Sequence, residues 1–324
     1  MSLLAGVILK LIKCCAVVVS SLLLTACGND NDDTAYSSVS FSVSDAPVDS
    51  ADNVVIAFDQ LEFIQADGTR IIVAVDEDTA GHNYQQIDLL DYPGSNSALI
   101  LTDQVLPVGD YKELIIHIEA NKALSYVNDS NGTNELKQPS NKLKLGSFTI
   151  KDETVQSFTI EFDLRQSLVM RGNIGNNNGY ILKPHGVTII DNDTAASLKG
   201  TVDSNLFAVP PCVNDTGNYV YLYEGHNLDS TTLVDNFDAD DDEFNNILPV
   251  SGSSVPYAST SVDLSTGDYA FGFLPSGNYT VAFTCSAVGD DPVQFDALTI
   301  PDPTSQLQKV TLLDSQEVIH NFNL

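Results

Sequence analysis

Apolar and polar residues alternate with a period of two through most of the chain beyond residue 35. Val39, Phe41 and Val43, for example, are separated by serines. Similar short segments lie at 52–64, 71–75, 111–119, 148–150, 158–162 and 181–190. This alternation is typical of strands with one buried face, and no window has an apolar stripe of helical period with capping residues. The pattern therefore predicts an all-β fold.

The polar segment 191–196 interrupts this pattern, and a second series of short apolar segments follows it. The strands expected there lie at 219–223, 268–273 and 278–284, and near Leu298, Val310 and Val318. Many short strands with closely spaced turns favour β-sandwiches. We therefore predict two consecutive β-sandwich domains, over residues 36–192 and 193–324.

The first 27 residues have the pattern of an export signal. Lys10 and Lys13 flank the start of an apolar run over 14–24, which is about half as long as a membrane-spanning helix needs to be. A positive start, a short apolar core and small residues at the cut are typical of a signal peptide. The run ends in Leu-Thr-Ala-Cys, which resembles the bacterial lipobox, so Cys27 is predicted to be acylated. The alternative is an ordinary signal peptide with an accidental cysteine.

Residues 28–35 are polar and acidic apart from Ala35. Such a segment cannot offset its ordering entropy and is expected to be a flexible tether. The resemblance to lipoproteins implies sorting to the outer membrane, because Gly28 rather than an aspartate follows the cysteine. We therefore expect an outer-membrane lipoprotein of the bacterial cell envelope, in a periplasmic or a surface-facing orientation.

Acidic residues greatly exceed basic ones. The 324 residues include 44 Asp and Glu but 14 Lys and Arg, which gives a formal net charge of −30. A surface of this sign makes nucleic acids and anionic lipids poor partners for the body of the protein. The expected partners are the membrane, through the lipid anchor, and a glycan or another envelope protein.

The five cysteines fit an extracytoplasmic protein. Cys14 and Cys15 leave with the signal peptide, and Cys27 carries the lipid. Cys212 and Cys285 remain as an even pair in an oxidising compartment, which predicts one disulfide. Free buried thiols are the alternative.

Catalytic motifs are absent from the sequence, and the five histidines have no ligand spacing, so we expect no enzymatic activity and no cofactor. Asp45 and Asp49 flank Pro47 in a predicted turn, where they would cap backbone amides or share a cation. Asp163 and Arg165, two residues apart on one predicted strand, are expected to form a structural ion pair or to pair with a neighbouring strand.

The acidic run 235–243 is the best candidate for a metal site. Asp238, Asp240 and Asp242 have the alternating spacing of a calcium loop. However, Glu243 and Pro249 stand where an EF-hand requires glycine and glutamate. The run predicts weak calcium binding at most, and a solvated acidic loop is the alternative.

The first block resembles a known domain family of unknown function, DUF4382. The resemblance rests on the motifs Ser-Asp-Ala-Pro-Val-Asp at 44–49, Ile-Asp-Leu-Leu at 87–90 and Leu-Pro-Val-Gly-Asp-Tyr at 106–111, and on 158–165 and 181–184. It covers roughly residues 36–192. The family is typically found in bacterial lipoproteins, which agrees with the lipobox, and it implies no activity.

The second block is similar to transthyretin-like or carboxypeptidase-regulatory-like sandwiches, grouped with starch-binding-like folds. The similarity rests on residues 200–202, 219–223, 266–271 and 274–281. It implies a fold whose members often act as rigid spacers or adhesive modules, and some of which bind sugars.

Together these observations favour a lipid-anchored envelope protein with a non-catalytic binding or structural role. The alternative is a carbohydrate-binding accessory lipoprotein, for which Tyr219, Tyr221 and Tyr223 would form an aromatic platform unless they pack against the other sheet. An enzyme of unrecognised type is the third hypothesis.

Overall fold

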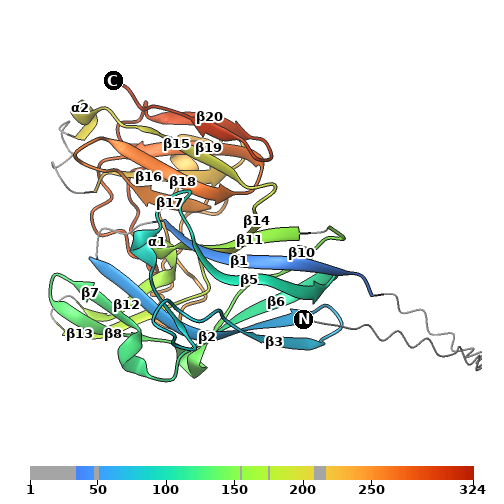
Figure 1. Ribbon diagram of the computed structural model, residues 1–324. Coiled ribbons are helices and arrows are strands. Elements are labelled where there is room, and N and C mark those ends of the chain that lie inside the picture. The colour runs from blue at the N-terminus through green and yellow to red at the C-terminus, as the bar shows by residue number, and fades with distance from the viewer. Residues whose placement is uncertain (1–33, 47–50, 154, 174–175, 208–216) are drawn as a thin grey trace, which may run out of the picture. The chain divides into compact units, whose positions relative to one another are not determined.

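The fold is all-β, as the alternation of apolar residues predicts (Figure 1). The computed structural model describes residues 34–46, 51–153, 155–173, 176–207 and 217–324. Within these residues, Ala35–Leu324 forms one compact unit. No helix of the described residues is long and apolar enough to span a membrane.

The strands up to residue 191 form two sheets, which we call the N-terminal lobe. Its strands are β1 (Tyr36–Ala46), β2 (Asn53–Gln65), β3 (Arg70–Ala74), β4 (Gln85–Asp88), β5 (Ala98–Pro107), β6 (Gly109–Ile118), β7 (Tyr126–Asp129), β8 (Gly132–Lys137), β9 (Lys142–Lys144), β10 (Phe148–Ile150), β11 (Val155–Asp163), β12 (Leu168–Asn173), β13 (Asn176–Leu182) and β14 (Val187–Asp191). One sheet has the order β14-β11-β1-β5, and the larger sheet has the order β10-β6-β2-β7-β8-β13-β12, with β3 and β4 paired to β2 and β9 paired to β6. Its helices are α1 (Leu164–Ser167) and the 3-10 turns η1 (Leu89–Asp91), η2 (Lys122–Leu124) and η3 (Pro139–Asn141).

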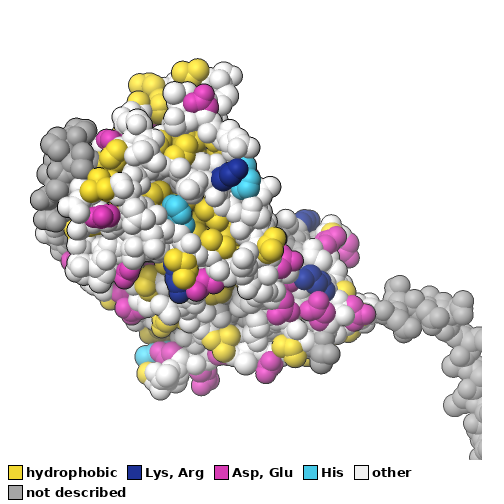
Figure 2. All heavy atoms as spheres, turned by 90° about the horizontal axis from the view of Figure 1, so that it is seen from above, with side chains coloured by type: hydrophobic (Ala, Val, Ile, Leu, Met, Phe, Trp, Pro, Cys, Tyr) yellow, Lys and Arg dark blue, Asp and Glu magenta, His cyan; other side chains and the backbone are white. Residues whose placement is uncertain are grey.

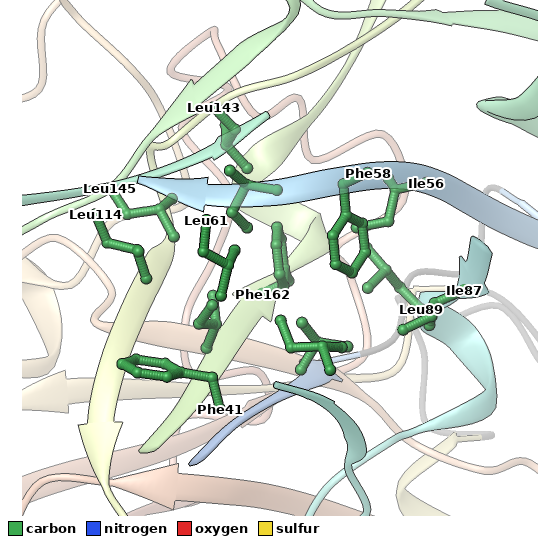
Figure 3. Packing of buried hydrophobic residues seen from close by; sticks show 14 of the residues in the cluster. Phe41, Ile56, Phe58, Leu61, Ile87, Leu89, Leu114, Leu143, Leu145 and Phe162 are labelled. Carbon is green, nitrogen blue, oxygen red and sulfur yellow. The ribbon is translucent and has the colours of Figure 1, made fainter. Parts of the chain in front are cut away.

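Alternate residues of these strands fill one core between the two sheets. Phe41 of β1 and Phe162 of β11 point toward Phe58 and Leu61 of β2 in Figure 3. All four side chains are fully buried. Because strand side chains alternate between faces, the serines between the apolar residues of β1 lie on the outer face of their sheet.

The strands from residue 196 onward form a second pair of sheets, the C-terminal lobe. Its elements are β15 (Ala196–Thr201), α2 (Ser204–Phe207), β16 (Tyr219–Glu224), η4 (Ser230–Thr232), β17 (Ala258–Ser261), β18 (Asp268–Leu274), β19 (Gly277–Thr284), β20 (Leu307–Leu312) and β21 (Glu317–Ile319). The sheets β18-β15-β21 and β17-β16-β19-β20 enclose a core that includes Leu198, Phe271 and Phe283. The other face of β16 is covered by loops, against which its tyrosines are buried.

Two expected strands differ in the structure. The segment 181–190 is split between β13 and β14, because Pro184 and Gly186 lie in a turn and Gly186 has a φ of 74°. No strand forms near Leu298, whose backbone N–H instead donates to the carboxylate of Asp235 at 2.6 Å. The boundary between two domains at residue 192 stays a prediction.

Candidate functional site

The C-terminal lobe covers part of the outer face of the sheet β14-β11-β1-β5. Phe158, Ile160 and Phe162 of β11 point into the N-terminal core, so Glu161 and Asp163 point to the opposite face. There β1 and β11 contact β18, while β11 and α1 contact β17. A polar strand face that looks solvent-exposed in the sequence is therefore an interface between the lobes.

Arg165 of α1 is the centre of this interface. Its guanidinium forms an ion pair with Asp290, and the two side chains are only 7% and 2% exposed. It also donates to Ser259 Oγ and Tyr221 Oη at 3.0 Å each, and it lies 3.5 Å from the ring centroid of Tyr219. Burial acts to lower the pKa of Arg165, but the neighbouring Tyr221 and Asp290 hold it above its usual value. Arg165 is therefore a buried, charged contact from one lobe into the other.

Asp163 connects the same lobes through the backbone. Its side chain caps α1 by accepting from Arg165 N–H at 3.0 Å, and its other oxygen accepts from the backbone N–H of Ser259 in β17 at 2.9 Å. Burial raises the pKa of this carboxyl to about 7, against the opposing effects of the Ser259 hydrogen bond and of Arg165. The expectation that Asp163 and Arg165 share a strand face was wrong, because the strand ends at Asp163 and Arg165 belongs to α1.

Two further carboxyl groups are buried beside Asp163. Asp45 is fully buried, and the nearest backbone donor to its carboxylate, the N–H of Leu164, does not form a hydrogen bond of good geometry with it. The turn at residues 47–50, with Asp49, lies outside the described residues, so the caps expected of Asp45 and Asp49 stay predictions. Burial raises the pKa of Asp45 and of Glu161 well above the usual range, and the charge of Asp163 raises both further.

A small cavity of about 30 Å³ lies between the lobes, lined by Glu161, Asp163, Tyr257 and Phe273 among others. A space of this size holds about one water molecule and no organic substrate. Buried carboxyl groups with raised pKa values are often catalytic. Here Glu161 and Asp163 line a space that is too small for an organic substrate, which favours a structural role.

The acidic run forms a second contact between the lobes. Arg171 of β12 binds Asp241 with two hydrogen bonds of 3.1 and 3.0 Å. Lys183 binds Asp238 at 2.5 Å and also Asp241. Burial acts to raise the pKa of Asp241, but the hydrogen bonds from Arg171 and Lys183 hold it well below its usual range.

The three residues of the predicted calcium loop are thus not equivalent. Asp238 is buried and paired with Lys183, whereas Asp240 and Asp242 are exposed. Within the described ranges, no three His, Cys, Asp or Glu side chains are grouped so that they could hold a metal ion. Calcium binding by this run stays a prediction.

The other predicted residues have the following places. Cys285 is buried, with 1% of its surface exposed. Cys212 and Cys27 lie outside the described residues, so the disulfide and the lipidation stay predictions. Tyr219, Tyr221 and Tyr223 are all buried, as packing requires, and they offer no aromatic platform to solvent.

An open groove of about 1180 Å³ lies over the outer face of β15, β18 and β21. Lys199 and Thr201 of β15 and Asp268 of β18 line it, and Gly94 of the N-terminal lobe forms part of its rim. The exposed side chains there carry hydroxyl, carboxylate and ammonium groups. Among the sites described here, this groove has enough room for an organic ligand.

The sequence did not identify Arg171, Lys183 and Asp290 as site residues. The sequence feature that these three residues share is charge. Cations are few in this chain, and acidic side chains are spread widely over the face in Figure 2. A cation in such a protein is expected to have an acidic partner. Which acid it meets depends on the packing of the lobes, which no local pattern contains.

The family comparison agrees with the first block of the sequence. Residues 36–184 match the family model described as "Domain of unknown function (DUF4382)". This confirms the resemblance of the N-terminal lobe to that family. The resemblance of the C-terminal lobe to transthyretin-like sandwiches stays a prediction. No curated protein matches the sequence.

Several solved structures align with most of the chain at low similarity. The Bacillus anthracis TIE protein is 11% identical over 89% of this chain, with a TM-score of 0.20, and this chain spans 34% of its length. A streptococcal ancillary pilin is 11% identical over 89% of this chain and 68% of its own, with a TM-score of 0.23. The minor pilin GBS52 of Streptococcus agalactiae is 10% identical over 88% of this chain and 94% of its own, with a TM-score of 0.17. TM-scores this low carry no conclusion about function.

Proposed function

We propose that this protein is a lipid-anchored module of the bacterial outer membrane with a non-catalytic structural or binding role. The observation that carries the proposal is that the buried charged side chains bind one another across the contact between the lobes. Arg165, Asp163 and Asp290 join the two lobes, and the cavity beside them has a volume of about 30 Å³. Buried charged side chains can indicate an active site, but here they stabilise the contact between the two lobes.

Lipidation at Cys27 is the part of this proposal that is tested most directly. Cells fed a fatty-acid analogue should label the protein and carry it in the membrane fraction. Cys27→Ser should abolish the label and release the protein from the membrane, because stable anchoring requires the acyl chains on this cysteine. Cys15→Ser is the matched control, since this cysteine precedes the lipobox. Equal labelling of the wild type and Cys27→Ser would refute the anchor.

Carbohydrate binding is the second candidate, and the groove over β15, β18 and β21 favours it. Sugars present many hydroxyl groups, which hydroxyl and carboxylate side chains such as Thr201 and Asp268 can bind. A glycan array probed with the purified protein should then show hits that Thr201→Ala and Asp268→Asn both weaken. Hits that survive both substitutions would place binding elsewhere, and an array without hits would favour the structural role.

A further inference from the structure

Three exposed apolar side chains lie together on one end of the sheet β14-β11-β1-β5. Ser38 of β1 is paired with Val105 of β5 on one side and with Val155 of β11 on the other. Directly paired residues point to the same face of a sheet, and Tyr36 lies two residues before Ser38 on that face. Tyr36, Val105 and Val155 are 58%, 58% and 55% exposed. We call these three side chains the N-terminal patch.

The opposite end of β1 is covered on this face. Ser42 and Ser44 continue the same side of the strand and are 9% and 0% exposed. Ser44 lies against the carbonyl groups of Tyr92 and Gly94, and β1 contacts β18 of the C-terminal lobe. In Figure 1 the N-terminal end of β1 extends beyond the C-terminal lobe. The exposed apolar side chains therefore belong to the uncovered end of a face whose other end is an interface.

The position of the patch along the chain decides what can cover it. Tyr36 is both a member of the patch and the first residue of β1. Tyr36 is nine positions after Cys27 in the sequence, and nine residue steps reach about 30 Å when fully extended. If Cys27 is anchored, the patch is held next to lipid at a high effective concentration, where even a weak contact is populated.

We infer that the N-terminal patch docks on the phospholipid surface to which the chain is anchored, so that the body lies on the membrane in one orientation. Tyrosine suits this place because its ring is apolar and its hydroxyl remains in water. The inference rests on the lipid anchor proposed above and adds the orientation of the body.

The charges around the patch specify the kind of lipid. Asp103 accepts a hydrogen bond from Ser38 at 3.4 Å, and Asp152 and Glu153 are exposed just before Val155. Carboxylates at the rim repel anionic headgroups and attract the ammonium group of phosphatidylethanolamine. The surface that fits is therefore zwitterionic phospholipid.

The chain contains no tryptophan, so one introduced tryptophan reports one position. The lipidated full-length variants Tyr36→Trp and Val105→Trp would be reconstituted into vesicles of phosphatidylethanolamine and phosphatidylcholine. Their emission should shift to shorter wavelength and be quenched by brominated phosphatidylcholine. Leu324→Trp is the control, because this residue is 76% exposed at the other end of the chain, and its emission should not change.

A second variant tests the apolar contact itself. Adding Val105→Asp and Val155→Asp to Tyr36→Trp should abolish the quenching, while circular dichroism remains unchanged because both side chains are exposed in the folded protein. Replacing part of the phosphatidylcholine by phosphatidylglycerol should reduce the quenching, and an increase would overturn the lipid class.

Flotation of the vesicles separates this inference from the anchor. Protein that does not float with lipid contradicts the lipid anchor. Protein that floats while Tyr36→Trp and Val105→Trp remain unquenched has an anchor but no docking, which overturns the inference alone. A blue shift in vesicles without quenching means that a second copy of the chain covers the patch, and it overturns the inference as well.

Discussion

Arg165 and Asp290 lie 125 residues apart in the sequence and form an ion pair between the two lobes. Their side chains are 7% and 2% exposed. Charges this deeply buried gain little net stability over apolar residues of similar size, but removing one partner leaves the other charge without compensation. The pair therefore specifies how the lobes meet more than it adds to their attraction.

Arg165→Ala should lower the free energy of unfolding by about 3–5 kcal/mol, because it leaves the Asp290 carboxylate buried and uncompensated. Urea denaturation at neutral pH measures the change. Lys199→Ala is the control, since Lys199 pairs with Glu317 and both side chains are about half exposed. Its loss should remain below about 1 kcal/mol, and equal losses in the two variants would contradict the buried pair.

Gly272→Ala should separate the lobes without changing any charge. A Cβ added at Gly272 of β18 would lie 2.0 Å from the carbonyl oxygen of Gly94. Because this oxygen belongs to the backbone, the clash is relieved only if the two segments move apart. We expect limited proteolysis to cut between the lobes faster in this variant. Gly146→Ala is the control, because its Cβ would meet nothing within 4 Å. Unchanged cleavage of Gly272→Ala would mean that the lobes are not held at this contact.

The fold class follows from local pattern because strand periodicity is a local property. The segments predicted at 52–64 and 71–75 form the paired strands β2 and β3, and β10 has the bounds predicted at 148–150. The break at Pro184 and Gly186 shows the limit of this reasoning. Apolar residues on both sides continue the alternation, so the pattern alone does not reveal that the chain turns.

The site depends on contacts between residues far apart in the sequence, which is why little of it could be predicted. Glu161 and Asp163 have the positions of solvent-facing strand residues, and only the C-terminal lobe covers them, so that Glu161 is half-buried and Asp163 buried. The acidic run reads as a metal loop or a solvated loop when Lys183 and Arg171 are not known to face it. Charge alone indicates that pairs must form, while packing decides which ones.

Stability should fall as pH rises from about 4 to 7. The pKa of Asp163 is about 7 in the folded protein, against an unfolded value near 4. The folded state therefore binds more protons in this interval, and raising the pH favours unfolding. The raised pKa values of Asp45 and Glu161 act in the same direction. Melting temperatures measured across this range should decline.

Asp45→Asn tests the origin of this decline. An amide keeps the shape of the side chain but does not ionise, so the variant should lose less stability between pH 5 and 8 than the wild type. The exposed Asp152→Asn is the control and should follow the wild type. Parallel curves for Asp45→Asn and the wild type would show that Asp45 does not titrate in this interval.

Glu62 should produce the opposite dependence in acid. Burial acts to raise its pKa, but hydrogen bonds from His117, Lys142 and Arg70 lower it to about 2. A carboxyl with a lowered pKa contributes stability that is present above its unfolded value and is lost as the pH falls toward 2. In Glu62→Gln the melting temperature should therefore fall less as the pH is lowered toward 2, while its decline above pH 5 should remain unchanged.

The effect of calcium should depend on Lys183. In the wild type, Lys183 and Arg171 already compensate Asp238 and Asp241, so a divalent cation has little repulsion left to relieve. Lys183→Met removes one positive charge and should lower the melting temperature at neutral pH. If the acidic run binds calcium, millimolar calcium should then restore part of the loss, by about 1 kcal/mol at several times its Kd. Magnesium should do less, because it holds its water more tightly.

The control adds Asp238→Asn, Asp240→Asn and Asp242→Asn to Lys183→Met, and it should abolish the response to calcium. If Lys183→Met has the same melting curve in calcium and in chelator, the acidic run is an ion-paired loop that binds no metal.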